Sequence, residues 1–265
     1  MEKVFVIKIG GNVVDNDNLL QFFLKKFANL PFKKVLIHGG GKIATEMSKQ
    51  MGLEVKMVEG RRITDEATLK VITMVYGGLI NKNIVGKLQS FNCNAIGLTG
   101  ADGNLISSKK RPIKSGIDYG FVGDIELVNV DLLTTLLNAN VSPVVAPISY
   151  EKKQGQLLNT NADTIASVLA IALSKFFNTH LIYCFEKKGV LRDVSDENSV
   201  IPEISHAAFQ ELKEAGAIFE GMIPKLDNAF QSMQSGVQAL SIGHAENLEA
   251  MVNGEKSSCT QLLIK

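Results

Sequence analysis

Short apolar runs along this chain alternate with longer segments whose apolar residues recur at helical spacing. The short runs predict strands, at residues 4–9, 35–38, 94–100, 142–148, 179–185, 237–244 and 260–264. The helical spacing predicts helices, near residues 19–27, 43–51, 65–72, 79–88, 132–137, 165–173, 205–215 and 226–233. This alternation is typical of an α/β fold in which helices cover both faces of a mainly parallel sheet.

Two local features refine this outline. Thr64 stands before the helix at 65–72 and is placed to cap it, while Asp65 and Glu66 complement the helix dipole. Residues 101–128 hold many Gly, Ser, Lys and Asp, which predicts one or two exposed β-hairpins. The basic run 109–111 within them is predicted to be a solvated face.

Composition narrows the class of protein. Of 265 residues, 45% are hydrophobic and 21% are charged, and the formal net charge is +1, which argues against a nucleic-acid-binding face or a polybasic anchor. The three cysteines are widely spaced without a Cys-x-x-Cys pair, so they indicate neither a disulfide framework nor a zinc site. With no signal-peptide pattern and no apolar stretch of about 20 residues, we expect a soluble cytoplasmic protein.

The first strand contains the most informative anomaly, Lys8, directly before the turn formed by Gly10 and Gly11. A lysine is almost never fully buried unless an anionic group pairs with it. A cation in a central strand next to a glycine turn therefore suggests a phosphate site. The alternative is a lysine at the strand edge that extends to solvent.

A second strand runs into Gly39-Gly40-Gly41-Lys42, followed by a helix whose N-terminus favours an anion. Gly39-x-Gly41-x-x-Ala44 also satisfies a dinucleotide-binding fingerprint, with Glu59 as the acidic residue. That alternative leaves the Lys8 turn without a role. The Walker pattern fails, because neither Lys42 nor Lys87 is followed by Ser or Thr.

Further candidate binding residues lie later in the chain. Arg61 and Arg62 occupy a turn, and an arginine fork matches a carboxylate or phosphate. Asn159, Asn161 and Asp163 precede an apolar helix, and capping explains only one of them. Asp163 is a candidate partner for Lys8. Lys225 follows Pro224 at the start of a helix, a poor location for a cation unless an anion binds there.

Nearly the whole chain resembles the amino acid kinase family and, within it, the acetylglutamate kinases of arginine biosynthesis. The resemblance depends on the order and spacing of six motifs: Lys8-Ile9-Gly10-Gly11, His38-Gly39-Gly40-Gly41, Gly60-Arg61-Arg62-Ile63-Thr64, Phe121-Val122-Gly123, Leu158-Asn159-Thr160-Asn161-Ala162-Asp163 and Gly221-Met222-Ile223-Pro224-Lys225. It implies a three-layer αβα sandwich around a mainly parallel sheet. One continuous domain would comprise an acyl-amino-acid lobe, residues 1–175, and a nucleotide lobe, residues 176–265.

The implied reaction is transfer of the ATP γ-phosphoryl group to the side-chain carboxylate of an N-acylated glutamate. By resemblance, Lys8 and Lys225 stabilise the transferring group and Asp163 orients both lysines. The substrate-binding residues would be Gly40, Gly41, Arg62 and Asn159. The nucleotide would contact Gly10, Gly11 and the segments 186–191 and 217–219, including Glu186, Gly189, Leu191 and Phe219. Magnesium would arrive with ATP, and no protein metal site is expected.

This chemistry agrees with the lack of histidine or serine machinery. A carboxylate with a pKa of about 4.3 is already ionised at neutral pH, so the acceptor needs no general base. Positioning and charge cancellation by lysines, glycine-turn amides and helix N-termini suffice.

Two departures from the family pattern stand out. Phe185-Glu186-Lys187-Lys188 replaces the usual Thr-Asp or Ser-Asp, which puts the nucleotide contacts there in doubt. Arg61 and Lys42 add cations near the expected acyl pocket. They suggest that the acyl group itself carries a carboxylate, as in N-succinyl-L-glutamate, paired with Arg61 or Lys42. The alternative is that both cations face solvent.

The chain starts directly with the first strand, without the extra N-terminal helix of arginine-inhibited hexameric relatives, so we expect a homodimer without arginine feedback. The competing functions are a nicotinamide-dependent oxidoreductase and a catalytically silent regulatory module. Within the family, carbamate, uridylate, aspartate and carrier-linked aminoadipate kinases are the other candidates.

Overall fold

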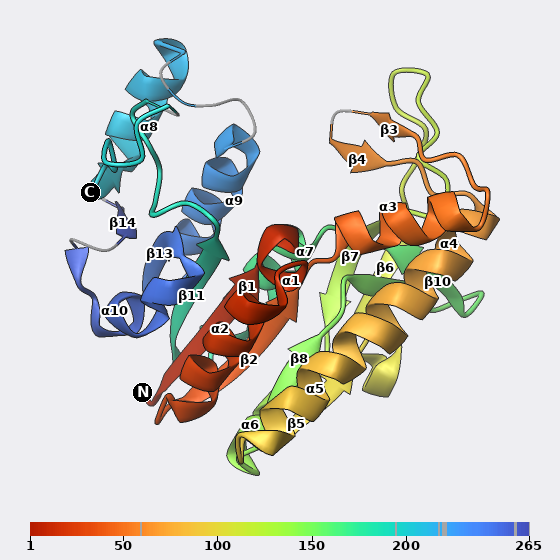
Figure 1. Cartoon of the computed structure of the whole chain (residues 1–265), viewed down its shortest axis with the longest axis horizontal. Helices are drawn as coiled ribbons and strands as arrows, with labels where there is room; N and C mark the ends of the chain where they lie inside the picture. The colour runs from red at the N-terminus through yellow and green to blue at the C-terminus, as the bar shows by residue number, and fades with distance from the viewer. Residues whose placement is uncertain (59, 194, 217, 219–221, 257–258, 265) are drawn as a thin grey trace.

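The computed structural model describes every residue of the chain except 59, 194, 217, 219–221, 257–258 and 265. Its centre is an eight-stranded sheet in the order β12-β14-β13-β11-β1-β2-β8-β5 (Figure 1). The strands are β1 (Lys3–Ile9), β2 (Lys33–His38), β5 (Ala95–Leu98), β8 (Ser142–Val145), β11 (Asn178–Phe185), β12 (Glu203–Ser205), β13 (Ala239–His244) and β14 (Cys259–Leu263). Only the β13–β14 pairing is antiparallel, so the sheet is mainly parallel as predicted.

Helices cover both faces of this sheet, and β1 shows why. Val4 and Val6 pack into one core and Phe5, Ile7 and Ile9 into the other, because successive side chains of a strand point to opposite faces. The first core includes residues of α6 (Val130–Asn138), α7 (Ala162–Leu173), α8 (His206–Glu214) and α9 (Ile223–Gln234). The second includes residues of α2 (Asp17–Asn29), α3 (Gly41–Gln50), α5 (Asn81–Ser90) and α10 (Leu248–Asn253). The molecule is therefore the predicted three-layer α/β sandwich, and Lys8 shares the α7 face with Val4 and Val6.

A second, four-stranded sheet lies beside the large one, in the order β10-β9-β6-β7. Its strands are β6 (Ile106–Lys110), β7 (Gly123–Val128), β9 (Ile148–Glu151) and β10 (Gln156–Asn159). The predicted hairpin within 101–128 is present as the antiparallel pair β6–β7. The single strand predicted at 142–148 was wrong: the chain leaves the large sheet after β8, passes Pro147 and enters the small sheet as β9.

The helix prediction at 65–72 needs two corrections. Asp65, not Thr64, caps α4 (Glu66–Ile72), since its side chain accepts a hydrogen bond from the backbone of Thr68. The helix then continues through the π-helical segment η1 (Thr73–Ile80) directly into α5, so the two predicted helices are one continuous rod. Thr64 is instead buried, and its backbone bonds to the loop at Tyr119 and Phe121.

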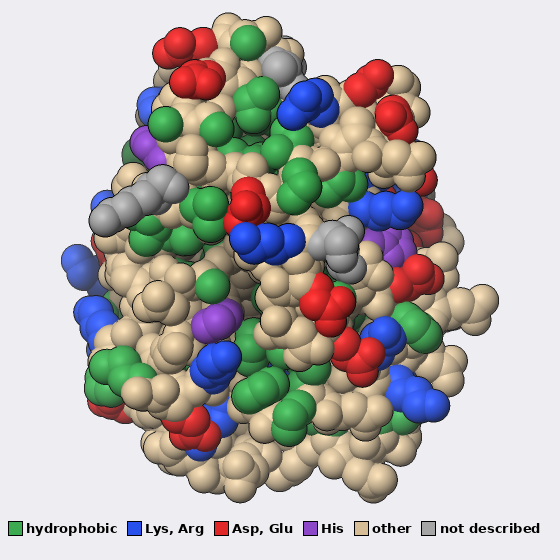
Figure 2. Space-filling view, turned by 90° about the vertical axis from the view of Figure 1, so that its left-hand side faces the viewer, with side chains coloured by type: hydrophobic (Ala, Val, Ile, Leu, Met, Phe, Trp, Pro, Cys, Tyr) green, Lys and Arg blue, Asp and Glu red, His purple; other side chains and the backbone are tan. Residues whose placement is uncertain are grey.

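The remaining short elements are α1 (Gly11–Val14), the 3-10 helices η2 (Asp102–Asn104) and η4 (Ala245–Asn247), and the two-stranded hairpin of β3 (Met57–Val58) and β4 (Arg61–Arg62). On the side of the molecule seen in Figure 2, acidic and basic side chains are interspersed, and no charge sign dominates that face. Among the described residues, no helix has both the length and the apolar character needed to span a bilayer.

Candidate active site

The glycine turns lie at the carboxyl ends of neighbouring central strands, where open α/β sheets bind their ligands. The turn after β1 is tied to β11, because the Gly10 amide donates to the Cys184 carbonyl at 3.0 Å. The turn after β2 is tied back to β1, with the Gly39 amide 3.1 Å from the Ile9 carbonyl. Both turns therefore belong to one site.

The second turn requires glycine. Gly40 has a φ of +147°, and a Cβ there would overlap Cδ1 of Ile80. The chain then enters α3 at Gly41, so the free amides of a ten-residue helix begin at this point. The backbone conformation at Gly40 thus aims the N-terminus of α3 at the site.

Lys8 and Lys225 meet at one carboxylate, as predicted. Lys8 Nζ lies 2.7 Å from Asp163 Oδ1, and Lys225 Nζ lies 3.7 Å from Asp163 Oδ2. Asp163 belongs to the first turn of α7, which packs on the face of the sheet that carries Lys8. Lys225 belongs to the first turn of α9, which packs beside α7. Two lysines from opposite ends of the chain thus share one buried acid.

The charges of this trio are mutually dependent. Burial would raise the pKa of Asp163, but Lys8 and Lys225 outweigh it and hold the pKa below its ordinary value. Burial lowers the pKa of Lys225, opposed by Asp163 and reinforced by repulsion from Lys8. One carboxylate cannot neutralise two ammonium groups, so the trio carries an excess positive charge.

The three polar residues around the start of α7 have three different roles, as their number suggested. Asn161 caps α7 by accepting a hydrogen bond from the Thr164 amide. Asn159 donates to Thr64 Oγ1 at 3.0 Å. Asp163 alone pairs with the lysines.

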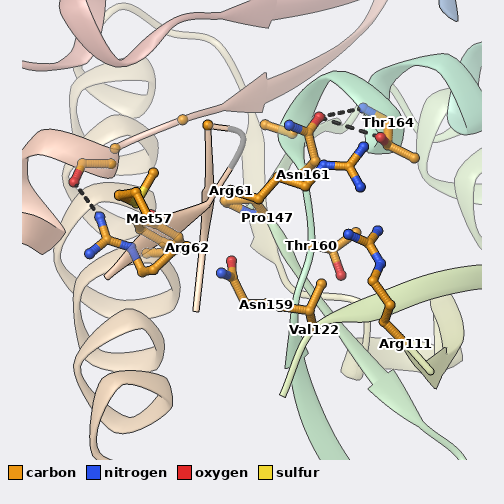
Figure 3. Close-up of a pocket in the computed structure, with 16 residues that line it drawn as sticks. Met57, Arg61, Arg62, Arg111, Val122, Pro147, Asn159, Thr160, Asn161 and Thr164 are labelled. Atoms are coloured by element: carbon orange, nitrogen blue, oxygen red, sulfur yellow. Dashed lines mark hydrogen bonds between the residues drawn. The ribbon is translucent and has the colours of Figure 1, made fainter. Parts of the chain in front are cut away.

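Two adjoining cavities make up the site. The first, here called the arginine pocket, has a volume of about 240 Å³ and is lined by residues that include Gly40, Arg61, Arg62, Arg111, Asn159 and Thr160 (Figure 3). The second, here called the lysine pocket, has a volume of about 760 Å³ and is lined by residues that include Lys8, Gly10, Gly11, Lys42, Phe185 and Lys225. Gly41, Met57 and Arg62 line both, so a ligand in one cavity can meet a ligand in the other.

Comparisons with known proteins show the family of this chain. The amino acid kinase family signature matches residues 3–244. The chain belongs to this family. It is 56% identical over 263 residues to the acetylglutamate kinase of Cytophaga hutchinsonii, covering 99% of each chain. It is 54% identical to that of Parabacteroides distasonis, covering 94% of this chain and 96% of the relative. A solved structure from Streptococcus mutans superposes with a TM-score of 0.80 at 25% identity and covers 99% of both chains.

Within this amino acid kinase, Arg62 is the most firmly held of the candidate clamps. It is buried, and its Nη2 donates to the Gly41 carbonyl at 3.0 Å and to Thr45 Oγ1 at 2.7 Å. Its Nη1 is buried without a hydrogen-bond partner among the described residues. Figure 3 shows Arg62 and Arg111 on opposite sides of the pocket. Burial raises the pKa of the neighbouring Tyr76, and the charge of Arg62 opposes this rise.

The structure separates the two extra cations noted in the sequence. Arg61 is exposed and lines the arginine pocket. Lys42 lines the lysine pocket instead, next to the trio of Lys8, Asp163 and Lys225. Arg61 therefore belongs to the arginine pocket and Lys42 to the lysine pocket.

Sequence reasoning missed Arg111, which it assigned to a solvated basic run. Both Nε and Nη2 donate to Asp124 Oδ1, at 2.9 and 2.7 Å, and the guanidinium lies 5.4 Å from the Tyr119 ring centre. Its Nη1 is buried without a hydrogen-bond partner in the described part of the chain. Alternation along the hairpin could have placed Arg111 beside its acid, but only the fold brings it to a pocket wall.

The predicted nucleotide contacts divide into three groups. Gly10, Gly11 and Glu186 line the lysine pocket. Gly189 and Leu191 are not among its lining residues. A Cβ at Gly189 would overlap Thr260 of β14 and Val200, so this glycine is required for packing against them. Phe219 lies outside the described residues, as does Glu59 of the oxidoreductase alternative.

The oxidoreductase alternative gives Lys8 no role, whereas the structure places Lys8 and the glycine turns in one site.

No group of three or more His, Cys, Asp or Glu side chains capable of holding a metal occurs among the described residues. The histidine beneath the second turn is structural. His38 is fully buried, with Nδ1 2.8 Å from the Gly39 carbonyl and Nε2 3.2 Å from the Asn81 amide nitrogen. Burial lowers its pKa to about 4, so it remains neutral. His244 caps a turn, because its Nδ1 accepts a hydrogen bond from the Glu246 amide.

Proposed function

We propose that this protein transfers the γ-phosphoryl group of ATP to the side-chain carboxylate of an N-acyl-L-glutamate, as a step of arginine biosynthesis. The observation that carries the proposal is the trio of Lys8, Asp163 and Lys225, which adjoins a pocket containing the buried fork of Arg62. The names of the relatives at more than 50% identity support the same assignment.

The arginine pocket would hold the acyl-amino acid. The free Nη1 of Arg62 suits the α-carboxylate, because a guanidinium pairs with a carboxylate through a planar fork. The Asn159 amide and the Gly40 and Gly41 backbone would bind the remaining polar groups. The γ-carboxylate would then point towards the residues shared with the lysine pocket.

The lysine pocket would hold the nucleotide, on the side formed by the C-terminal lobe, residues 176–265. Gly10, Gly11 and Glu186 line it and would contact the nucleotide, whose bound Mg²⁺ would neutralise charge on its phosphates. Lys8 and Lys225 would stabilise the charge that develops on the transferring group, and Asp163 would fix both ammonium groups. The acceptor carboxylate is already ionised and needs no base.

An ADP-release assay with N-acetylglutamate, N-succinylglutamate, aspartate and UMP tests the proposal. We expect turnover only with an N-acylglutamate, in the presence of Mg²⁺. Turnover of aspartate or UMP alone would assign another acceptor, and the absence of ADP release with all four would contradict the kinase assignment.

Two acyl groups compete for the arginine pocket. The names of the relatives favour N-acetyl. The cations favour an acyl group with a terminal carboxylate, such as N-succinyl, because Arg61 and Arg111 both line this cavity. We propose the N-succinyl compound as the preferred substrate.

The variant Arg111→Leu separates these two substrates. It should lower kcat/KM about 10-fold or more for N-succinylglutamate while changing the value for N-acetylglutamate less than threefold. Arg192→Leu, at an exposed position outside both pockets, is the matched control. A wild-type preference for N-acetylglutamate would end the succinyl proposal.

We further propose a cytoplasmic homodimer without arginine feedback. The edge strand β5 exposes Ile96, and the π-helical segment η1, which continues into α5, exposes Met74 and Leu79. These three side chains supply apolar surface for contact with a second copy of the chain. Light scattering should give twice the chain mass, and Leu79→Lys should reduce it to the monomer. A hexamer, or inhibition by arginine, would contradict the proposal.

A further inference from the structure

An aromatic ring lies beneath both lysines of the site. Phe185 ends β11, is 9% exposed and lines the lysine pocket. Its ring centre lies 3.9 Å from Lys225 Nζ and 5.1 Å from Lys8 Nζ, both within the range of a cation–π interaction. A single ring therefore contacts both ammonium groups that flank Asp163.

The two lysines depend on this ring to different degrees. Lys8 has a short ion pair with Asp163, at 2.7 Å, and lies further from the ring. Lys225 has the longer ion pair, at 3.7 Å, and the closer ring contact. Its side chain is also 28% exposed, against 7% for Lys8, so less packing restrains it. Phe185 thus supplies to Lys225 the restraint that Asp163 supplies to Lys8.

A π face differs from a carboxylate in one respect that matters for an anionic ligand. A second acid at this position would hold Lys225 but cancel its charge. The ring attracts the ammonium through its quadrupole and carries no net charge, so the excess positive charge of the trio is retained. An anion entering the lysine pocket would then meet the ammonium groups of Lys8 and Lys225, which share the carboxylate of Asp163.

The ring is itself firmly supported. Phe185 stacks with the fully buried Tyr183 at 6.2 Å between ring centres and 13° between planes. The Tyr183 hydroxyl lies 2.8 Å from Ser167 Oγ and 3.3 Å from the backbone carbonyl of Asp163. On the other side, Phe185 Cδ1 lies close enough to Gly10 that an added Cβ there would be 3.4 Å away. The ring is thus fixed relative to α7 and to the first glycine turn.

We propose that Phe185 is a positioning residue that holds the Lys225 ammonium beside Asp163 without neutralising it. The inference rests on the proposed function, in which Lys225 stabilises the transferring phosphoryl group. Because this stabilisation belongs to the transition state, losing the ring should lower kcat and leave the KM of the acyl-glutamate nearly unchanged.

The test compares Phe185→Leu with Phe185→Tyr in the full-length chain, using ADP release. Phe185→Leu keeps an apolar side chain but removes the π face, and we expect kcat to fall about 10-fold. Phe185→Tyr keeps the ring and should restore kcat to within about threefold of wild type. Phe209→Leu is the matched control, because that buried ring also contacts a lysine, Lys213 at 5.5 Å, but lies outside both pockets.

Fluorinated phenylalanines at position 185 separate electrostatics from packing. One to three ring fluorines weaken the π face while changing the shape little, so kcat should fall in graded order. Equal kcat across the fluorinated series, or a Phe185→Leu enzyme with wild-type kcat, would overturn the inference. If Lys225→Met instead left kcat unchanged, the proposed function of Lys225 would fail, so the two failures are distinguishable.

Discussion

The two cavities of the site hold their charged groups in opposite ways. In the arginine pocket each key side chain is hydrogen-bonded to protein: Arg62 to Gly41 and Thr45, Asn159 to Thr64, and Arg111 to Asp124. In the lysine pocket, by contrast, Lys8 and Lys225 both pair with the single carboxylate of Asp163. The positive charge of these two lysines is therefore not fully neutralised by that carboxylate.

This difference matches two different tasks. Forks held by several hydrogen bonds keep a fixed geometry, which suits recognition of a small ligand with a defined shape. Ammonium groups are compact charges, and two of them held beside one shared carboxylate leave a net positive charge that stabilises a transferring anion. We therefore infer that the arginine pocket selects the acceptor and that the lysine pocket supplies the charge for transfer.

Replacing Lys8 should produce the largest effect. In Lys8→Met, kcat should fall about 10²–10³-fold, since one oriented donor to the transition state is lost. The KM of the acyl-glutamate, set by the other pocket, should stay within about threefold. Lys26→Met, which removes an exposed ion pair of 2.9 Å with Glu249, is the control for a lost lysine. Near-normal turnover in Lys8→Met would place the transfer site elsewhere.

Replacing Arg62 should affect the other pocket. Arg62→Lys keeps the charge but loses the fork, so it cannot bond Gly41, Thr45 and a ligand carboxylate together. Initial-rate kinetics should show the KM of the acyl-glutamate rising about 30-fold and that of ATP changing little. A change in the KM of ATP of equal size would show that the two cavities do not divide the substrates.

The buried His38, beneath the second glycine turn, should make stability pH-dependent. The folded-state pKa of His38 is about 4, and the ordinary value is 6.5. Between these values the unfolded chain binds one proton more, so stability falls as pH falls from 6.5 towards 4. Urea unfolding at pH 7.5 and pH 5 should show a loss of about 2 kcal/mol attributable to His38.

The uncharged variant His38→Gln should lack that loss. Its free energy of unfolding should therefore depend less on pH over this range than that of the wild type. Equal pH dependence in the two proteins would show that His38 is not the group that titrates.

The smallest effect is expected for Lys42, an exposed residue that lines the lysine pocket. Its charge opposes the rise in the pKa of Asp15 that burial causes. Lys42→Ala should raise the KM of ATP two- to fourfold, because an exposed charge contributes little in water. The ratio of activities with N-acetyl- and N-succinylglutamate should not change. A shift in that ratio would place Lys42 at the acceptor after all.

Much of this molecule could be predicted from local sequence. The continuous apolar run of residues 4–9 predicted a buried central strand, and the single lysine within it indicated a charge that required a partner. The surplus of polar residues before α7 identified Asp163 as that partner, because one cap needs only one side chain. These inferences succeeded because a strand has a fixed period and a buried charge has a large cost.

Tertiary structure decided what depends on long-range proximity. The sequence by itself determined the α/β layers, the two glycine turns and the need for an anion near Lys8. Only the fold could place Lys42 in one cavity and Arg111 in the other, divide the segment around Pro147 between two sheets, and bring Phe185 beneath Lys225. Local periodicity fixes which face a side chain occupies, whereas the packing of distant elements fixes which side chain it meets there.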